Sequence, residues 1–220
     1  MPWYANPQWW AVIIAPSVAV LAILYDWIRS FIWKPKLKIS IELKPPDCQK
    51  VPLIDQETHR HVCDTYYFRF RIENTGNYRL EDVEVMITDL YQKNSKKEYG
   101  RQPFLPLNLR WSHSNTAVIP RIQSDLYKHC DFGHIIKSEN AKASHYDLPR
   151  PVKIVFLLDT IVRPTTGTFL LLPGDYKVRI IVGASNIKSE AKIYNLVVKD
   201  KWTDDEEEML RENVSITEVK

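Results

Sequence analysis

Histidine and cysteine side chains, the usual ligands of zinc, gather in two short segments. His59, His61 and Cys63 lie in "THRHVCD", where alternate positions of an extended chain share one face. The segment "KHCDFGH" adds three further candidates, His129, Cys130 and His134. Zinc takes three or four such ligands that converge in space, and neither spacing matches an established zinc pattern. We therefore predict no metal and no cofactor, and interpret the first segment as a polar loop that runs into a strand.

The number of cysteines indicates whether the domain lies in a reducing or an oxidising compartment. The chain has three, Cys48, Cys63 and Cys130, and an odd number leaves at least one thiol free. This count favours a reducing compartment over a disulfide scaffold. Cys63 would then be buried in its strand, whereas in an exported domain it would pair with Cys48.

Catalytic motifs are missing from the sequence. Ser112, His113, Ser114 and Asp125 are close along the chain, but a catalytic triad is defined in space. No G-x-S-x-G, H-E-x-x-H, P-loop or G-x-G-x-x-G motif occurs. We therefore expect a protein that is not an enzyme and has no catalytic residues.

Three arginines, Arg69, Arg71 and Arg79, lie on or beside a predicted strand. They could bind an anionic ligand, although outward charges on a strand more often serve solubility and protect sheet edges. The net charge of the chain is only +3, which is too small for a dedicated nucleic-acid binder.

The elements that would position these side chains are strands. "KLKISIELK" (residues 36–44) alternates apolar and polar residues, and so do residues 66–73, 83–87 and 176–182. "VKIVFLLD" (residues 152–159) is apolar throughout, as in a strand covered on both faces. Further strands are predicted at residues 105–111 and 191–198, with weaker signals at 125–132 and 168–171. About eight short strands with turn signals between them indicate a mainly β, antiparallel sandwich or barrel.

One short helix is expected after this domain. "WTDDEEEMLREN" (residues 202–213) has Thr203 as a candidate N-cap and Glu206 three residues on, the spacing of a capping box. The acidic run after Thr203 would lie at the positive end of the helix dipole, where negative charge is favourable.

A long apolar segment precedes the domain. Residues 9–25 carry no charge, and the apolar character continues to Trp33. Such a length can cross a hydrocarbon core of about 30 Å. Aromatic residues flank its two ends, Trp9 and Trp10 on one side and Trp27 and Trp33 on the other. The N-terminal flank has no basic residue, so we predict an uncleaved signal-anchor, a single-pass transmembrane helix, and neither a cleaved signal peptide nor a buried core helix.

Basic residues lie on one side of this segment. Arg29, Lys34, Lys36 and Lys38 are C-terminal to the apolar centre, which predicts a cytoplasmic domain because Lys and Arg stay on the cytoplasmic side. The same side chains would contact anionic headgroups of the lipid bilayer. We expect a short extracytoplasmic N-terminus (1–8), a transmembrane helix (9–33), a β-sandwich domain (36–200), and a C-terminal helix and tail (201–220).

Two segments resemble a known family. "FRIENTGNYRLEDVEVMI" looks like the strand–N-x-G–strand hairpin of bacterial immunoglobulin-like sandwiches of the CARDB and fibronectin-like kind, and "LPGDYKVRIIV" resembles their late P-G-x-Y strand. The resemblance implies an immunoglobulin-like fold, in which Tyr176 would form a corner hydrogen bond to nearby backbone. The long segments "PPDCQKVPLIDQETHRHVCD" and "KSENAKASHYDLPRP" exceed the usual turns of this family, and specialised function is expected there.

These observations predict a membrane-anchored β-sandwich that acts by binding. Its partner would be another protein or a second copy of the same chain. An alternative is a ligand-sensing membrane effector, for example in a bacterial defence or signalling system, that oligomerises through its span. A lesser alternative is an exported envelope domain, which requires the reverse orientation.

Overall fold

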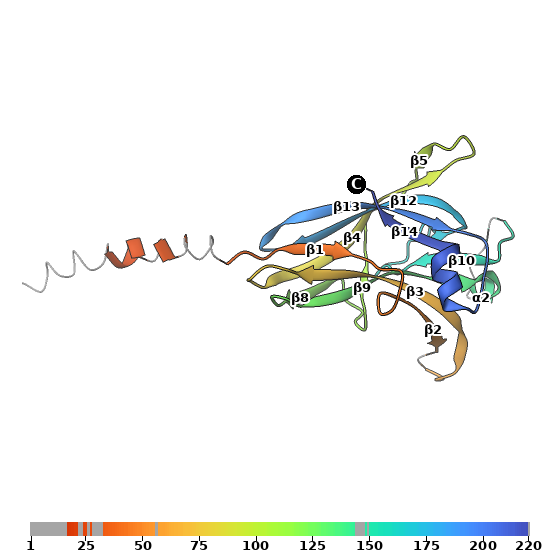
Figure 1. Ribbon diagram of the computed structural model, residues 1–220, viewed down its shortest axis with the longest axis horizontal. Coiled ribbons are helices and arrows are strands. Elements are labelled where there is room, and N and C mark those ends of the chain that lie inside the picture. The colour runs from red at the N-terminus through yellow and green to blue at the C-terminus, as the bar shows by residue number, and fades with distance from the viewer. Residues whose placement is uncertain are drawn as a thin grey trace, which may run out of the picture.

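The computed structural model describes residues 17–21, 24, 25, 27, 33–55, 57–143, 148 and 150–219. The predicted transmembrane helix, residues 9–33, lies largely outside these ranges. Its described residues 17–21, 24, 25 and 27 are helical, and Figure 1 shows them set apart from the sheets. Within the described ranges no helix combines the length and the apolar character needed to cross a membrane.

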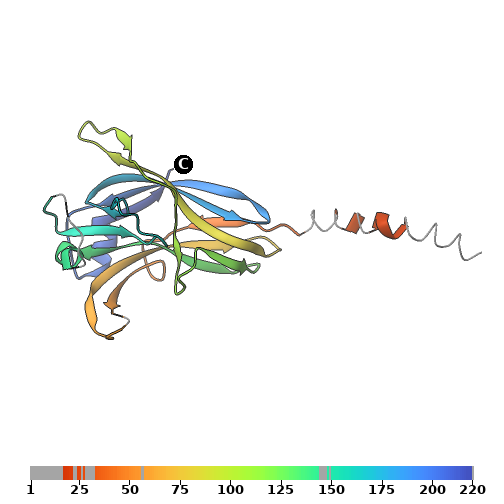
Figure 2. The same ribbon diagram turned by 180° about the vertical axis from the view of Figure 1, so that it is seen from behind.

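The rest of the chain is mainly β, as predicted, and forms two antiparallel sheets that lie face to face (Figures 1 and 2). The first sheet has the order β1-β3-β9-β10-β11, with β2 also paired to β3 and β7 to β9. Its strands are β1 (Leu37–Ser40), β2 (Cys48–Ile54), β3 (His61–Asn74), β7 (Arg110–Trp111), β9 (Tyr127–Lys137), β10 (Ile154–Leu158) and β11 (Leu170–Leu171).

The second sheet has the order β14-β13-β12-β4-β5, with β6 and β8 also paired to β4. Its strands are β4 (Leu80–Lys93), β5 (Tyr99–Arg101), β6 (Leu107–Asn108), β8 (Val118–Ile122), β12 (Gly174–Ala184), β13 (Ile187–Val198) and β14 (Val214–Glu218).

The core lies between the two sheets. Phe68, Phe70 and Ile72 of β3 are fully buried and alternate with outward-facing residues, as the sequence pattern predicted. The ring of Phe70 lies 4.8 Å from that of Tyr194 on β13, so the two sheets contact each other directly. Burying each such aromatic side chain contributes about 1.5–3 kcal/mol. All five residues of β10 are buried, which confirms the prediction of a strand covered on both faces.

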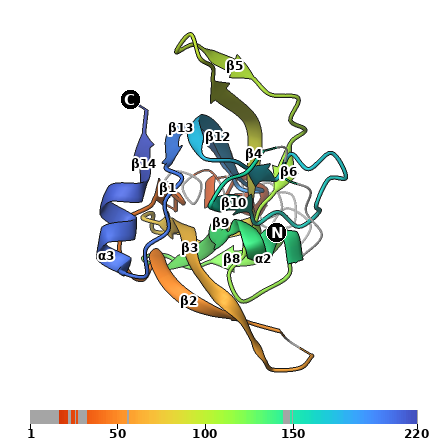
Figure 3. The ribbon, with the colours of Figure 1, turned by 90° about the vertical axis from the view of Figure 1, so that its right-hand side faces the viewer.

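The long segment before β3 is more regular than expected. Residues 48–54 form β2, and β3 begins at His61, so most of the predicted loop is a β-hairpin. Viewed from the end in Figure 3, this hairpin and the β4–β5 hairpin project from opposite sides of the molecule. Pro52 interrupts the alternation of β2, which is why the sequence pattern concealed this strand. The second long segment contains a short helix, α2 (Ser138–Ala143).

The C-terminal region also differs from the expectation of a helix and a tail. The helix is short, α3 (Glu206–Glu208) followed by the π-helical η2 (Met209–Asn213). Its N-cap is Asp205, whose carboxylate accepts a hydrogen bond from Glu208 N, so the prediction of Thr203 as N-cap was wrong. The chain then forms β14, which pairs with β13 and extends the second sheet beyond residue 200.

Candidate functional site

The first candidate region is the junction where the N-terminal segment joins the domain. Lys34 N donates to Asn77 Oδ1 (2.8 Å), and Asn77 N donates to Lys34 O (3.2 Å). Thr75 N donates to Lys36 O (2.8 Å). The chain is therefore attached to the turn between β3 and β4 from residue 34 onward, without a free linker.

Asn74 holds this junction together. Its side chain is fully buried, and its Oδ1 accepts hydrogen bonds from Lys36 N (3.3 Å) and Gly76 N (3.1 Å). Its Nδ2 donates to Tyr78 O (2.7 Å) and Ile122 O (3.1 Å). These four bonds use both donors and both lone pairs of the amide, and they join the incoming chain, the β3–β4 turn and β8.

Gly76 allows the incoming chain to approach the turn closely. A Cβ at this position would overlap Lys34 O and Lys36 N, and it would lie 2.7 Å from the carbonyl carbon of Pro35. The resemblance implied an N-x-G hairpin at Asn74–Gly76; a turn is present, but the hairpin prediction was wrong, because β3 and β4 lie in different sheets and do not pair. The reason for the glycine is the crossing chain, which only the tertiary structure reveals.

The predicted membrane-interface residues are partly described. Trp9, Trp10 and Arg29 lie outside the described residues. Trp27 and Trp33 are exposed, and the Trp33 ring stacks on Tyr78 with a centroid distance of 6.5 Å. Lys34, Lys36 and Lys38 are also exposed, and Lys38 pairs with Glu73 (3.0 Å).

The predicted His and Cys candidates are separated. His59 is in the turn before β3, His61 contacts Asp64 (3.0 Å), and Cys63 is buried. The pairing of β2 with β3 shifts register between Leu53 and Ile54, opposite residues 61–63, so His61 and Cys63 do not share one environment.

The candidates on β9 are each engaged elsewhere. His129 Nε2 contacts Asp47 (3.0 Å), His134 Nδ1 contacts Asp159 (3.0 Å), and Cys130 is fully buried. Within the described part of the chain, no three His, Cys, Asp or Glu side chains form a group that could hold a metal ion.

All three cysteines of the chain are described as free thiols, so Cys63 does not pair with Cys48. Burial raises the pKa of Cys48 to about 12, and it raises the pKa values of Cys63 and Cys130 as well. Such thiols are poor nucleophiles and poor metal ligands, because both roles need the thiolate.

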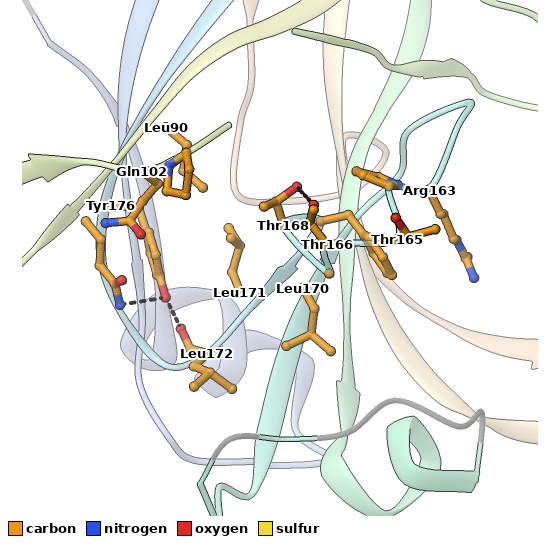
Figure 4. A pocket seen from close by; sticks show the side chains of 15 residues that line it. Leu90, Gln102, Arg163, Thr165, Thr166, Thr168, Leu170, Leu171, Leu172 and Tyr176 are labelled. Carbon is orange, nitrogen blue, oxygen red and sulfur yellow. Dashed lines mark hydrogen bonds between the residues drawn. The ribbon is translucent and has the colours of Figure 1, made fainter. Parts of the chain in front are cut away.

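The second candidate region is a pocket of about 740 Å³ between the loop after β10 and the start of β12 (Figure 4). β4 runs from Leu80 beside the junction to Lys93, about 40 Å at 3.3 Å per residue. Gln92 lines the pocket, so the pocket lies at the end opposite the junction. The lining residues are Leu90, Gln92, Gln102, Pro103, residues 163–172 and Tyr176.

Tyr176 forms one wall of this pocket. Its hydroxyl donates to Leu172 O (2.7 Å) and accepts from Gln92 Nε2 (3.2 Å). The predicted corner hydrogen bond is therefore present. Burial raises the pKa of Tyr176 to about 12, so the hydroxyl remains a donor well into the alkaline range.

The loop that closes the pocket was not singled out by sequence reasoning. Leu158 N donates to Phe169 O (2.8 Å), Gly167 has a φ of 70°, and three threonines, Thr165, Thr166 and Thr168, lie along the rim. The run "RPTTGT" between two strands is the signal that could have indicated it, because long ordered loops often bind ligands.

The third candidate region is on the face of the first sheet that points away from the second sheet. A polar pocket of about 570 Å³ is lined by Tyr67, Arg69, Arg110, Ser112, His113, Ser114, Asn115 and Asp131. Asp131 is the cross-strand partner of both Arg69 and Arg110. It accepts hydrogen bonds from Arg69 Nε (3.2 Å) and from the Ser112 hydroxyl. Burial raises the pKa of Asp131.

The structure divides the remaining predicted polar residues among separate environments. Arg71 forms a structural ion pair with the buried Asp47 (2.8 Å). Arg79 forms an ion pair with Glu81 (2.6 Å) near the junction. Ser112, His113 and Ser114 all line the polar pocket, where Ser112 contacts Asp131. Asp125 lies apart from them in the β8–β9 turn, where its N–H donates to Asn74 O (2.9 Å). Three of the four hydrolase candidates therefore share one pocket, and Asp125 is not part of it.

Comparison with known proteins adds no relative: no protein-family model and no curated protein sequence matches this chain.

Proposed function

We propose that the chain is a single-pass membrane protein whose immunoglobulin-like β-sandwich binds a partner at the cytoplasmic membrane surface and catalyses no reaction. The observation that carries this proposal is the exposed apolar surface before the domain. Val18, Leu21 and Trp27 are 59%, 64% and 66% exposed. Soluble chains rarely leave such a continuous apolar run uncovered, whereas lipid would cover it.

The junction supports binding close to the bilayer. The backbone of residues 34–36 is hydrogen-bonded to the β3–β4 turn, so a span that ends near Trp33 would hold the domain in one orientation. The exposed Lys34, Lys36 and Lys38 would then face anionic headgroups.

The pocket at the opposite end supports partner binding. It is wide, its walls are mostly apolar, and it presents a few hydroxyl and amide groups, which is typical of sites that bind a ligand or a peptide segment. Its location points it away from the membrane. The Tyr176–Leu172 hydrogen bond and the two facing sheets support the immunoglobulin-like assignment.

Membrane insertion is tested by fractionation. The full chain should stay in the membrane pellet after an alkaline carbonate wash, whereas a variant without residues 1–32 should become soluble. Release of the full chain by carbonate would contradict the anchor.

Orientation is tested with one introduced cysteine. The three native thiols are buried, so labelling background will be low. Ser95→Cys, on the exposed β4–β5 loop, should resist a membrane-impermeant maleimide in intact cells and react after permeabilisation. Labelling in intact cells would support the exported domain instead.

Partner binding is tested by photo-crosslinking in native membranes. A photoreactive residue at Gln102, on the pocket rim, should give a discrete adduct with a partner or a second copy of the chain. The same residue at the exposed Lys188 is the control and should give none. Equal products from both positions would argue against a specific site.

A second candidate function is a ligand-sensing membrane effector. The polar pocket between Arg69 and Arg110 favours it, because it is distinct from the apolar pocket and is lined by charged groups.

A further inference from the structure

The polar pocket on the outer face of the first sheet is lined by two arginines and one aspartate. Arg69 on β3 and Arg110 on β7 both lie in register with Asp131 on β9, so one carboxylate is placed between two guanidinium groups. Asp131 already accepts from Arg69 Nε and from Ser112. Among the lining residues, one carboxylate thus faces two permanent positive charges. Asp159, which lies outside the lining and contacts His134, also acts electrostatically on Asp131.

Arg110 is the arginine of this pocket that forms no ion pair with a described carboxylate. Its Nε is buried and has no hydrogen-bond partner, and no carboxylate of the described residues lies within 4.0 Å of its side chain. A buried N–H that loses water without gaining a partner costs free energy. An incoming anion would supply that partner through the planar fork of nitrogens.

The loop after β7 places further donors across the same pocket. Trp111 Nε1 donates to Ala117 O (3.1 Å), and Ser114 N donates to Trp111 O (3.0 Å), which holds the loop in one shape. His113 takes a φ of 61° within it. The loop thereby presents the polar groups of Ser114 and Asn115 to the pocket that Arg110 lines.

We propose that this pocket binds the phosphate or carboxylate group of a small soluble ligand, with Arg110 as the principal anion contact and Arg69 and the Ser114–Asn115 loop as secondary contacts. A lipid headgroup is a poorer source of the anion. Arg69 lies five residues along β3 from Asn74 at the junction, about 17 Å from the end that would face the bilayer. This proposal does not depend on the membrane anchor.

The test uses the full chain purified in a neutral detergent. Its melting temperature is followed by circular dichroism during titration with inorganic phosphate or citrate, with sodium chloride at equal ionic strength as reference. The wild type should show a saturable rise beyond that in chloride, because a ligand that binds only the folded state stabilises it. Arg110→Gln should weaken phosphate binding at least about tenfold.

Matched variants make the result specific. Arg101→Gln removes an exposed arginine that pairs with Asp89 on the second sheet, and it should keep the wild-type response. Arg110→Lys keeps the charge without the fork, and it should bind with intermediate affinity. If Arg110→Gln does not fold in chloride, Arg110→Lys replaces it as the test variant.

Either of two outcomes of the detergent titration overturns the proposal. One is a phosphate and citrate response no larger than that of chloride, and the other is an Arg110→Gln variant that binds like the wild type. Reconstitution distinguishes the source of the anion. The phosphate response should be the same in phosphatidylcholine nanodiscs and in nanodiscs that also contain phosphatidylserine. Loss of the response with phosphatidylserine would assign the site to headgroups and overturn the soluble ligand.

Discussion

Two residues, Asn74 and Gly76, determine how the domain is joined to the segment before it. Asn74 supplies four side-chain hydrogen bonds at a fully buried position, and Gly76 supplies the space for the crossing chain. Neither contribution is a property of the turn alone, because both involve residues 34–36.

Asn74→Ala should destabilise the domain by about 3 kcal/mol, since the part-buried backbone groups of Lys36 and Tyr78 and the buried carbonyl of Ile122 lose their partner. Urea denaturation of the full chain in mild detergent measures this change. Asn94→Ala is the control, because Asn94 is exposed and bonds only within its own turn. Its cost should be below about 1 kcal/mol, and equal costs for both variants would refute the role assigned to Asn74.

Gly76→Ala should cost about 2 kcal/mol or more, because the new methyl group meets backbone atoms that cannot rotate away. Gly100→Ala is a matched control, since the nearest atom to its Cβ would be Gln92 O at 4.0 Å. That change should stay within about 0.5 kcal/mol. Melting temperatures of the two variants compare the sites directly, and a stable Gly76→Ala variant would contradict the close approach.

The C-terminal elements link the two sheets. Glu206 of α3 accepts a hydrogen bond from Lys50 N on β2 (2.7 Å), and Tyr66 on β3 donates to Thr203 O (2.9 Å). β14 then pairs with β13 and buries Val214 and Ile216. The chain after residue 200 therefore belongs to the folded domain, and it covers an edge of each sheet.

Removal of residues 214–220 should destabilise the domain by about 3 kcal/mol or more, because two buried aliphatic side chains and a row of strand hydrogen bonds are lost. The uncovered edge of β13 should also promote aggregation. Light scattering during thermal unfolding records both effects. Removal of residue 220 alone is the control and should leave the melting temperature nearly unchanged, because the backbone bond from Val219 N to Ile193 O (2.8 Å) is kept.

The three candidate regions lie in different parts of the molecule. The junction lies at one end (Figure 1), the apolar pocket drawn in Figure 4 lies at the other, and the polar pocket lies on the outer face between them. The core that supports these regions buries several ionisable groups in their neutral form. Burial raises the pKa of Tyr66, Tyr67, Tyr176 and Cys48 each to about 12.

The domain should therefore unfold at alkaline pH. In the unfolded chain these groups lose their protons near pH 9–10, whereas in the folded state they hold them to about pH 12. The folded state binds more protons in that window, so stability is complete below about pH 9 and falls as the pH rises towards 12. Each such group contributes at most about 1.4 kcal/mol per pH unit.

Thermal unfolding followed by circular dichroism between pH 8 and pH 12 checks this expectation. This range spans the pKa values of the folded state. Tyr176→Phe should be less stable than the wild type at pH 8, because the bond to Leu172 O is lost. Its stability should then decline less steeply with pH, since one titrating group is gone. An unchanged slope would show that Tyr176 does not contribute.

Local patterns in the sequence identified much of the fold. The alternation through Phe68, Phe70 and Ile72, the buried run of β10 and the turn at Asn74–Asn77 all follow from residue type and short-range spacing. They could be predicted because the side-chain period of a strand and the conformational needs of a turn are properties of a few neighbouring residues.

The arrangement of distant segments was decided by the tertiary structure alone. Asp131 lies between Arg69 and Arg110 because β3 and β7 flank β9, and the loop after β10 closes over Tyr176 because the chain crosses there between the sheets. Likewise, the His and Cys residues that looked like neighbours were separated by a register shift and by burial. Alternation determines which face of a strand is buried, but strand pairing depends on packing and hydrogen bonds between residues far apart in the chain.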